Sequence, residues 1–271
     1  MIPHVLAALA LFSMGPATAV QASELAGNLI LVGNGPEQTV METLARAFEK
    51  MHPRVYVDVL WDPSSNPREL VKNGQAHIAV ATSAYPGLTA TQIGWDGIGI
   101  LVHLSNFTKE LTSQQVSLIF TGAIKEWSEV GGPETKILVI DRPPDQTIRD
   151  TFVSHLGITG KMSDAAKVIG SDDQVVKTVA GTLPPLSAIA YISLSSALSA
   201  VSSGVAVRLL PIDKVEAEAP TVRDGRYSLR QPLLLLSRPE SDPLVRAFTT
   251  FALSASGQAI IGGEYIALKS D

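Results

Sequence analysis

The chain has 271 residues, of which 45% are hydrophobic and 17% are charged, and its formal net charge is −5. This composition is typical of a globular protein and excludes disordered and fibrous classes, while the length favours two lobes of roughly 100 to 150 residues each. The 21 basic residues are scattered without a run of Lys and Arg, which argues against nucleic acid as a partner. The lack of cysteine excludes disulfides, thiolate metal sites and lipid attachment through cysteine.

Residues 1–22 have the pattern of a secretion signal. Their apolar run, residues 5–14, is too short to span a bilayer comfortably, and a Gly-Pro pair ends it before a stretch of small residues. Cleavage after Ala19 or Ala22 would release a soluble protein into the periplasm, and this is the outcome that we expect. A retained membrane anchor stays open as the alternative, because the amino terminus is the only certain positive charge of the segment.

The first half of the chain alternates strands with helices. Residues 28–32 predict a buried strand that ends in a glycine turn, and residues 39–51 have apolar side chains at helical spacing. VYVDVLW then predicts a second strand, so that the unit is a strand-turn-helix-strand crossover. Such crossovers form parallel sheets, in which anions bind at strand ends beside helix N-termini. AHIAVATSAY and IGWDGIGILVHL predict two further strands.

The same alternation continues to the C-terminal end. LTSQQVSLIFTG predicts a helix, ILVIDR a strand, PPDQTIRD a loop that opens a helix, and AIAYISLSSAL a strand that leads into a helix. RQPLLLLSR indicates a strongly apolar strand, and residues 243–262 predict a helix and its continuation. The fold class is therefore α/β. We found no internal repeat of fixed period, which excludes solenoids and propellers.

Five segments of this chain resemble a known family in the same order. Residues 111–132, LTSQQVSLIFTGAIKEWSEVGG, closely resemble the part of phosphate-binding proteins where an LT-start helix, an IF-x-G turn and a W-x-x-V-G-G loop follow one another. DGIGILV precedes this segment, and AIAYISLSSAL, DGRYSLRQPLLLLS and FALSASGQAII follow it. The chain is thus similar to type II periplasmic binding proteins, in the subgroup that binds phosphate for bacterial ABC transporters.

The resemblance implies two α/β lobes with mixed sheets, joined by two crossover segments near Val102 and Val205. The first lobe would be built from both ends of the chain, which gives the following boundaries: signal 1–22, first lobe 23–102, second lobe 103–205, and return segment 206–271 of the first lobe. The resemblance also implies a receptor that closes around phosphate or a related oxyanion and passes it to an ABC permease in the inner membrane. We expect a monomer without a cofactor or a metal.

In the family, strand-to-helix turns from both lobes supply the ligand contacts. The first turn provides backbone amides and a hydroxyl, and this chain has Gly-Asn-Gly-Pro at residues 33–36, where proline removes one donor. The second turn provides a serine, and the third provides Ser-Asp or Ser-Arg, where this chain has Ala-Thr-Ser at residues 81–83. The third turn therefore lacks an acidic acceptor, the group that selects a protonated phosphate over sulfate. Tight turns without a ligand are the alternative for the first two.

The fourth turn, RPPDQTIRDTF, resembles a family segment in which Arg is followed, after three residues, by Ser-Gly-Thr at a helix start. Arg142 matches the arginine, and its guanidinium can bind an oxyanion through forked, charge-assisted contacts. Its alternative role is an ion pair with Asp141 or Asp145. The Ser-Gly-Thr positions hold Gln, Thr and Ile. The resemblance assigns ligand binding to Asn34, Gly35, Ser64, Ser83, Arg142, Gln146 and Thr147.

This altered pocket leaves three functions open: weaker or altered oxyanion binding, binding of a different small solute, and a signalling or interaction role without tight phosphate binding. An enzyme is the least favoured class. The five histidines are far apart and form no H-E-x-x-H pair, and no G-x-S-x-G motif occurs. The sequence therefore predicts a binding protein and assigns no catalytic residue.

Overall fold

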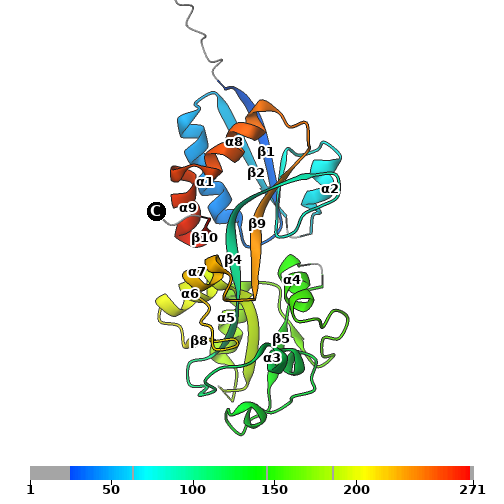
Figure 1. Cartoon of the computed structure of the whole chain (residues 1–271), viewed down its shortest axis with the longest axis vertical. Helices are drawn as coiled ribbons and strands as arrows, with labels where there is room; N and C mark the ends of the chain where they lie inside the picture. Colours follow the sequence, from blue (N-terminus) through cyan, green and yellow to red (C-terminus); the bar gives the residue numbers. More distant parts are fainter. Residues whose placement is uncertain (1–24, 63, 145, 185, 269–271) are drawn as a thin grey trace, which may run out of the picture.

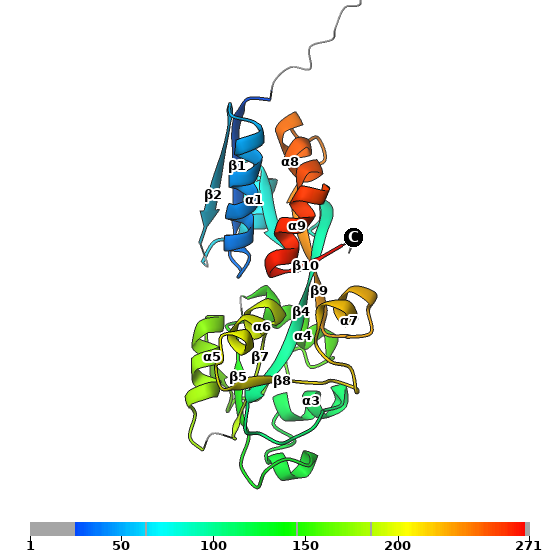
Figure 2. The same cartoon turned by 90° about the vertical axis from the view of Figure 1, so that its left-hand side faces the viewer.

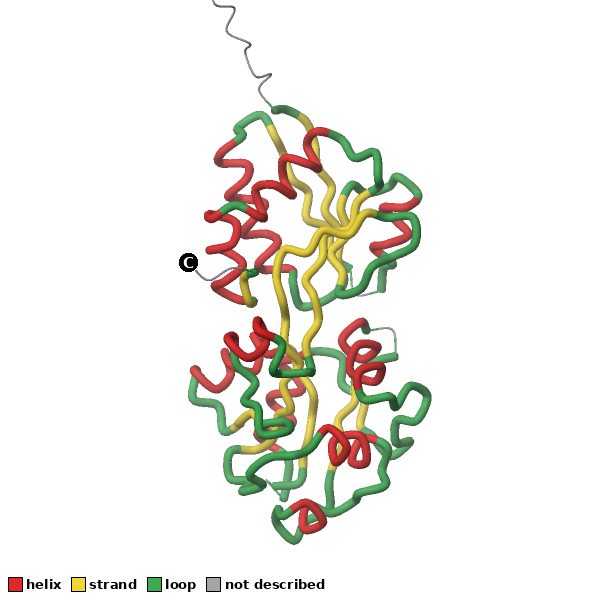
Figure 3. The backbone as a smooth tube through the Cα atoms, in the orientation of Figure 1, coloured by secondary structure: helices red, strands yellow, loops and turns green. Residues whose placement is uncertain are grey.

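The computed structural model describes residues 25–268 except 63, 145 and 185, so the predicted signal segment 1–22 lies outside the described residues. These residues form two lobes, one above the other in Figure 1, and two long strands run between them. The two strands are β4 (Thr89–His103) and β9 (Arg230–Ser237). Figure 3 shows both as continuous yellow segments between the lobes.

The first lobe contains a mixed sheet with the strand order β2-β1-β3-β9-β4. β1 is parallel to β2 and β3, whereas β9 is antiparallel to β3 and β4. In Figure 2, α1, α8 and α9 lie together beside this sheet. The other elements of this lobe are β1 (Gly27–Gly33), α1 (Gln38–Met51), β2 (Val55–Trp61), α2 (Pro67–Lys72), β3 (Ile78–Ala81), α8 (Pro243–Leu253), α9 (Ala255–Glu264) and β10 (Ile266–Ala267).

The second lobe is built on the far half of β4, which pairs antiparallel with β7 and β8. β5 lies parallel to β7 and β6, so this sheet is mixed as well and the predicted architecture is confirmed. Its elements are α3 (Ser113–Phe120), a 3₁₀ turn (Trp127–Val130), β5 (Leu138–Asp141), α4 (Thr147–His155), β6 (Lys167–Val168), α5 (Asp172–Gly181), β7 (Ala188–Ser193), α6 (Leu194–Ser202), β8 (Val207–Leu210) and α7 (Ala219–Asp224).

The chain crosses between the lobes at two adjacent points. β4 pairs with β9 as far as Gly97 and with β7 from Ile98 onward, while the return begins with the pairing of Arg230 to Gly97. The sequence placed these crossings near Val102 and Val205. The structure differs most at the return, because β8 pairs with β4 inside the second lobe and Leu229 still packs into the second-lobe core.

Each lobe has a core on both faces of its sheet. Within the predicted apolar strand β9, Leu233 and Leu235 pack on one face with α1 and α8, and Leu234 and Leu236 pack on the other with α2. This arrangement explains why the strand is a continuous apolar run rather than an alternating one. The predicted helix 243–262 is divided at Ser254 into α8 and α9.

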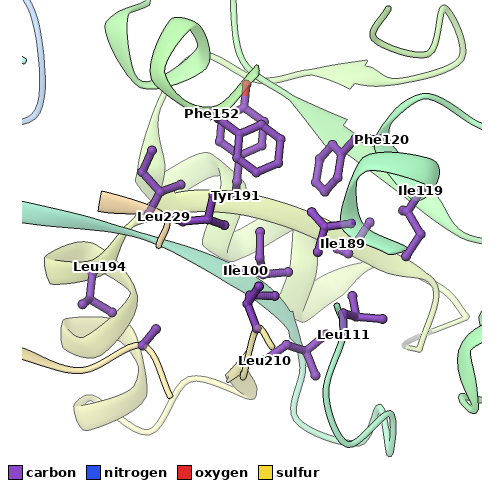
Figure 4. Packing of buried hydrophobic residues seen from close by; sticks show 14 of the residues in the cluster. Ile100, Leu111, Ile119, Phe120, Phe152, Ile189, Tyr191, Leu194, Leu210 and Leu229 are labelled. Carbon is purple, nitrogen blue, oxygen red and sulfur yellow. The ribbon is translucent and has the colours of Figure 1, made fainter. Parts of the chain in front are cut away.

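An aromatic cluster fixes α4 on the second sheet (Figure 4). The rings of Phe152 and Tyr191 are stacked with centroids 3.9 Å apart, and Phe120 meets Phe152 edge-on at 4.8 Å. Such pairs contribute about 0.5 to 1.5 kcal/mol beyond their burial. Because Tyr191 lies on β7 and Phe152 on α4, the cluster sets the position of the α4 N-terminus.

No single helix in the described part of the chain is long and apolar enough to cross a membrane. Among the described residues, α8 and α9 would have the length and apolar composition of a membrane span if taken as one helix, but they are bent by 66° at their junction.

Replacing Gly97 with alanine is expected to destabilise the fold by about 1 to 3 kcal/mol, because overpacking distorts its neighbours. A Cβ atom there would lie 2.8 Å from Leu194 Cδ2 and 3.0 Å from Val222 Cγ2, at the point where β4 leaves the first sheet. Urea unfolding measures the change. Gly263→Ala is the matched control, since apart from its chain neighbours and its own helix backbone no atom lies within 4 Å of the added Cβ, and alanine favours the helix. Equal stability of the two variants would contradict this prediction.

Candidate ligand-binding cleft

A cavity of about 220 Å³ lies between the two lobes at the crossing strands. Five of the seven predicted ligand residues line it, and they come from both lobes: Asn34, Gly35, Arg142, Gln146 and Thr147. The remaining lining residues were not predicted as ligand contacts: Pro36, Glu37, Ile148, Gly170, Ser171, Asp172 and Gln231.

The first turn forms the wall that the first lobe contributes. Gly33 ends β1 beside Trp61 at the end of β2, and a Cβ on this glycine would lie 2.2 Å from the Trp61 ring. Trp61 Nε1 donates a hydrogen bond to the carbonyl oxygen of Gly35 at 2.7 Å, and Asn34 Nδ2 donates to the carbonyl oxygen of Ser65 at 3.2 Å. The lack of a side chain at Gly33 therefore leaves room for the Trp61 ring, and Trp61 holds the turn in place beside the cavity.

Helix N-termini surround this cavity on both sides. α4 begins at Thr147, and its N-cap Gln146 makes no capping hydrogen bond among the described residues. The first N–H groups of a helix have no partner within the helix, and they carry the positive end of its dipole. α1 starts directly after Glu37, and α5 starts at Asp172. An anion in this cavity would therefore meet the positive ends of three helices.

Arg142 follows β5 and is almost fully buried, at 5% exposure. Its Nη1 forms a 2.8 Å ion pair with Asp172 Oδ1, its Nε donates to Gln146 Oε1 at 2.9 Å, and its Nη2 donates to the carbonyl oxygen of Gly170 at 3.1 Å. A guanidinium has five N–H groups, so two remain without a partner among the described residues. The side chain is thus held rigidly while it keeps donors for a ligand.

The alternative ion pair of Arg142 with Asp141 does not form. The Asp141 carboxylate instead pairs with Arg149 at 3.0 Å, and it accepts hydrogen bonds from Tyr191 Oη at 2.6 Å and from the backbone N–H of Arg142 at 2.8 Å. Asp145 lies outside the described residues. The partner of Arg142 is Asp172, which is 30 residues away in the sequence.

Gln146 orients Arg142 within the second lobe. Its Oε1 accepts from Arg142, and its Nε2 donates to the carbonyl oxygen of Gly170 at 2.7 Å. The sequence predicted a direct ligand donor at this position. Both ends of this amide make a hydrogen bond within the lobe, so the side chain holds the guanidinium in place and keeps one N–H for a ligand.

Ser64 and Ser83 do not line the cavity that the described residues form. Ser64 is exposed, and its hydroxyl donates to Asp62 Oδ1 at 2.7 Å within its own turn. Ser83 is also exposed, and its hydroxyl accepts from Arg68 Nη1 at 3.4 Å. The Ser64 hydroxyl thus bonds within its own turn, as its alternative role predicts, and the ligand roles of both serines stay predictions.

Buried carboxyl groups accompany the single arginine. Glu37 is 5% exposed, and its burial raises the pKa of its carboxyl group to about 7. Asp96 on β4 is 4% exposed, and burial raises its pKa to about 8 although Ser193 and Gln231 donate hydrogen bonds to it. Both carboxyl groups, and that of Asp172, repel one another as anions. The region between the lobes therefore combines the guanidinium of Arg142 with two buried acids, Glu37 and Asp96, whose carboxyl groups have raised pKa values.

A larger cavity of about 940 Å³ adjoins the first, and Pro36 and Asp172 line both. Residues of α5, α6 and α9 form most of its wall, so it also lies between the lobes. Within the described residues, no group of three or more His, Cys, Asp or Glu side chains is placed to hold a metal ion.

Two α/β lobes on paired crossing strands, with helix N-termini and a guanidinium around a shared cavity, define the class of two-lobed solute-binding proteins. The family model for the PBP superfamily domain matches residues 18–256, and the chain belongs to this family.

Similar proteins share this architecture over most of their length. The phosphate-binding protein PstS of Bacillus subtilis is 26% identical over 243 residues, which cover 87% of this chain and 78% of that protein. One similar structure is described as a phosphate ABC transporter substrate-binding protein from Clostridium perfringens with bound phosphate. It is 27% identical to this chain, with a TM-score of 0.78, and the match covers 90% of this chain and 100% of that one. An ABC-type phosphate transport receptor from Vibrio cholerae is 26% identical, with a TM-score of 0.76, and the match covers 88% of this chain and 99% of that one.

Proposed function

We propose that the chain is the extracytoplasmic substrate-binding protein of an ABC transporter for phosphate or a related oxyanion. The anion binds in the 220 Å³ cavity between the lobes. The observation that carries this proposal is the placement of Arg142 and the α4 N-terminus, both in the second lobe, on the same cavity as Asn34 and Gly35 of the first lobe. The phosphate-binding proteins to which the chain is similar support the choice of ligand.

In this site the charge of Arg142 is already balanced by Asp172, so the attraction for an anion comes largely from oriented N–H groups. Arg142 has two N–H groups without a partner among the described residues, and the first amides of α4, at Thr147 and Ile148, face no acceptor within the helix. Donors of this kind bind oxyanions without a net positive surface. The overall charge of −5 is therefore compatible with anion binding.

Ligand binding would also close the cleft. A ligand that contacts both lobes favours the closed state by its difference in affinity for the two states. Closure would bring the turn at Asn34 toward the N-terminus of α4 and would expel water from the cavity. The closed form is the one that we propose is presented to an ABC permease in the inner membrane, by a monomer released into the periplasm after cleavage of residues 1–22.

Phosphate is expected to raise the thermal stability of the protein. At 100 times the dissociation constant, a ligand that binds only the folded state adds about 2.7 kcal/mol. Differential scanning fluorimetry with phosphate, arsenate, molybdate and sulfate measures the shift, and isothermal titration calorimetry gives the affinity. Stabilisation by none of the four anions would contradict the proposal and would favour an interaction role for the fold.

A further inference from the structure

The larger cavity between the lobes is acidic, and the proposed function does not use it. Its volume is about 940 Å³, and it adjoins the 220 Å³ cavity, because Pro36 and Asp172 line both. Four acids line it: Asp96, Asp172, Asp173 and Glu264. Lys177 is the only basic residue of its wall within the described residues. A ligand held by an anionic group in the smaller cavity can therefore extend into acidic surroundings.

Two of these acids have no ion-pair partner within the described residues. Asp172 pairs with Arg142, and hydrogen bonds within the protein hold Asp96. Asp173 and Glu264 take part in none of the ion pairs that the described residues form. Asp173 lies in the first turn of α5 in the second lobe, and Glu264 ends α9 in the first lobe (Figure 2). A cation between these two carboxylates would therefore contact both lobes.

A buried tyrosine next to Glu264 gives an independent indication of a ligand. Tyr265 is 7% exposed and lines the 940 Å³ cavity, yet its hydroxyl makes no hydrogen bond within the described part of the chain. The side-chain atoms of the described residues that are both enclosed and without a partner belong to Thr108, Asp172 and Gln231. The unpartnered hydroxyl of Tyr265 therefore keeps accessible surface.

This hydroxyl lies near acids of both cavities. Burial raises the pKa of Tyr265 well above its ordinary value, and negative charge on four acids raises it further: Glu37, Asp96, Asp172 and Glu264. Glu37 lines the smaller cavity and Glu264 the larger one. A neutral hydroxyl in such a field can accept a hydrogen bond from a cation, and the cation would offset the repulsion among the acids.

We propose that the ligand is a phosphoryl compound with an alkylammonium group, that is, an aminoalkyl phosphate or phosphonate. Its oxyanion binds in the 220 Å³ cavity, and its ammonium group binds in the 940 Å³ cavity between Asp173 and Glu264 and donates a hydrogen bond to the Tyr265 hydroxyl. Inorganic phosphate fills the oxyanion part alone. This inference rests on the proposed oxyanion-binding function and adds the class of ligand. Each charge of such a zwitterion meets groups of the opposite sign in the cleft.

The test compares ligands that differ only in the ammonium group. O-phosphoethanolamine and propyl phosphate have the same phosphoryl group, and a methyl group replaces the ammonium in the second. At pH 8.5 both phosphoryl groups are dianions, and an alkylammonium remains protonated, as lysine does. Calorimetry with the full mature chain is expected to show phosphoethanolamine bound at least about tenfold more tightly.

A second pair of ligands distinguishes the two sources of this chemistry. 2-Aminoethylphosphonate is expected to show the same advantage over propylphosphonate, and the tighter of the two amines shows whether the site is adapted to an ester or to a phosphonate. Equal affinities within both pairs, or binding of inorganic phosphate alone, would overturn the inference and leave oxyanion binding intact. A protein that binds none of these anions would instead contradict the proposed function.

Variants then locate the ammonium site. Asp173→Asn and Glu264→Gln are each expected to lower the affinity ratio of phosphoethanolamine to propyl phosphate about threefold, since partly exposed ion pairs contribute little individually. Tyr265→Phe is expected to lower this ratio while it keeps the affinity for propyl phosphate. Glu134→Gln is the matched control, because Glu134 is exposed and lines neither cavity. A wild-type ratio in the double variant Asp173→Asn/Glu264→Gln would overturn the assignment.

Discussion

Replacing Arg142 with alanine is expected to weaken phosphate binding at least about 30-fold, as measured by calorimetry. Hydrogen bonds from a charged donor contribute about 1.5 to 3 kcal/mol each, and Arg142 has two N–H groups available for a ligand. Lysine is not expected to restore binding, because its ammonium cannot hold Gln146 and Asp172 and bind the anion in one planar arrangement. Phosphate affinity in Arg142→Ala equal to that of the wild type would contradict the assignment of this cavity.

The same substitution is expected to lower the free energy of unfolding, and the design of the control depends on this effect. It leaves Asp172 without its partner, and breaking a buried pair costs about 3 to 5 kcal/mol. The cost is expected near the lower end, because Asp172 keeps 13% exposure and lies at the N-terminus of α5.

The double variant Arg142→Ala/Asp172→Asn is expected to recover stability but not binding. Asp172→Asn alone is expected to bind phosphate more tightly, since it removes the competing carboxylate.

The second large effect is a loss of stability as the pH rises from about 5 to 8 in the absence of ligand. Burial raises the pKa of Glu37 to about 7 and that of Asp96 to about 8, whereas both groups have ordinary values near 4 in the unfolded chain. In this interval the folded state binds more protons than the unfolded state, so the free energy of unfolding falls with pH. Each group contributes up to about 1.4 kcal/mol per pH unit until its folded pKa is passed. Urea unfolding at one-unit steps from pH 5 to 9 measures the slope.

Neutral variants separate the two contributions. Glu37→Gln is expected to reduce the slope up to pH 7, and Asp96→Asn is expected to remove most of the slope between pH 7 and 8. The exposed carboxyl groups of Asp62 and Asp224 have lowered pKa values. They make the free energy of unfolding rise with pH, and they do so below about pH 4, outside the measured interval. Stability that stays level or rises between pH 5 and 8 would contradict the burial of these two acids.

The sequence predicted most of the fold because local patterns specify its elements. The apolar run before Gly33 and the helical spacing of residues 39–51 both lie where β1 and α1 form. The loop before Thr147 opens α4 as expected. Each of these patterns depends only on residues that are close together in the sequence. The same patterns placed Arg142 and the glycine turn at strand ends, which line one cavity in the structure.

The site residues that the sequence missed depend on long-range pairing. Asp172 reaches Arg142 from the start of α5, and Gln231 meets Asp96 only because β9 returns beside β4. Glu37 could have been noticed as an acid in the first turn, but its burial is a tertiary property. The predicted return near Val205 was misplaced for a similar reason, since the short strand β8 has no local feature that assigns it to the second lobe.

The arrangement of β9, α8 and α9 has a consequence for the order of biosynthesis. The first lobe begins with β1, yet its sheet lacks a central strand until residues 230–237 have been made, and two of its covering helices come later still. Every buried residue of the second-lobe core except Ile266 has been made by Leu229. During synthesis from the N-terminus the lobe that starts first therefore finishes last, and a chain truncated before β9 would leave β3 with an open edge and an apolar face uncovered.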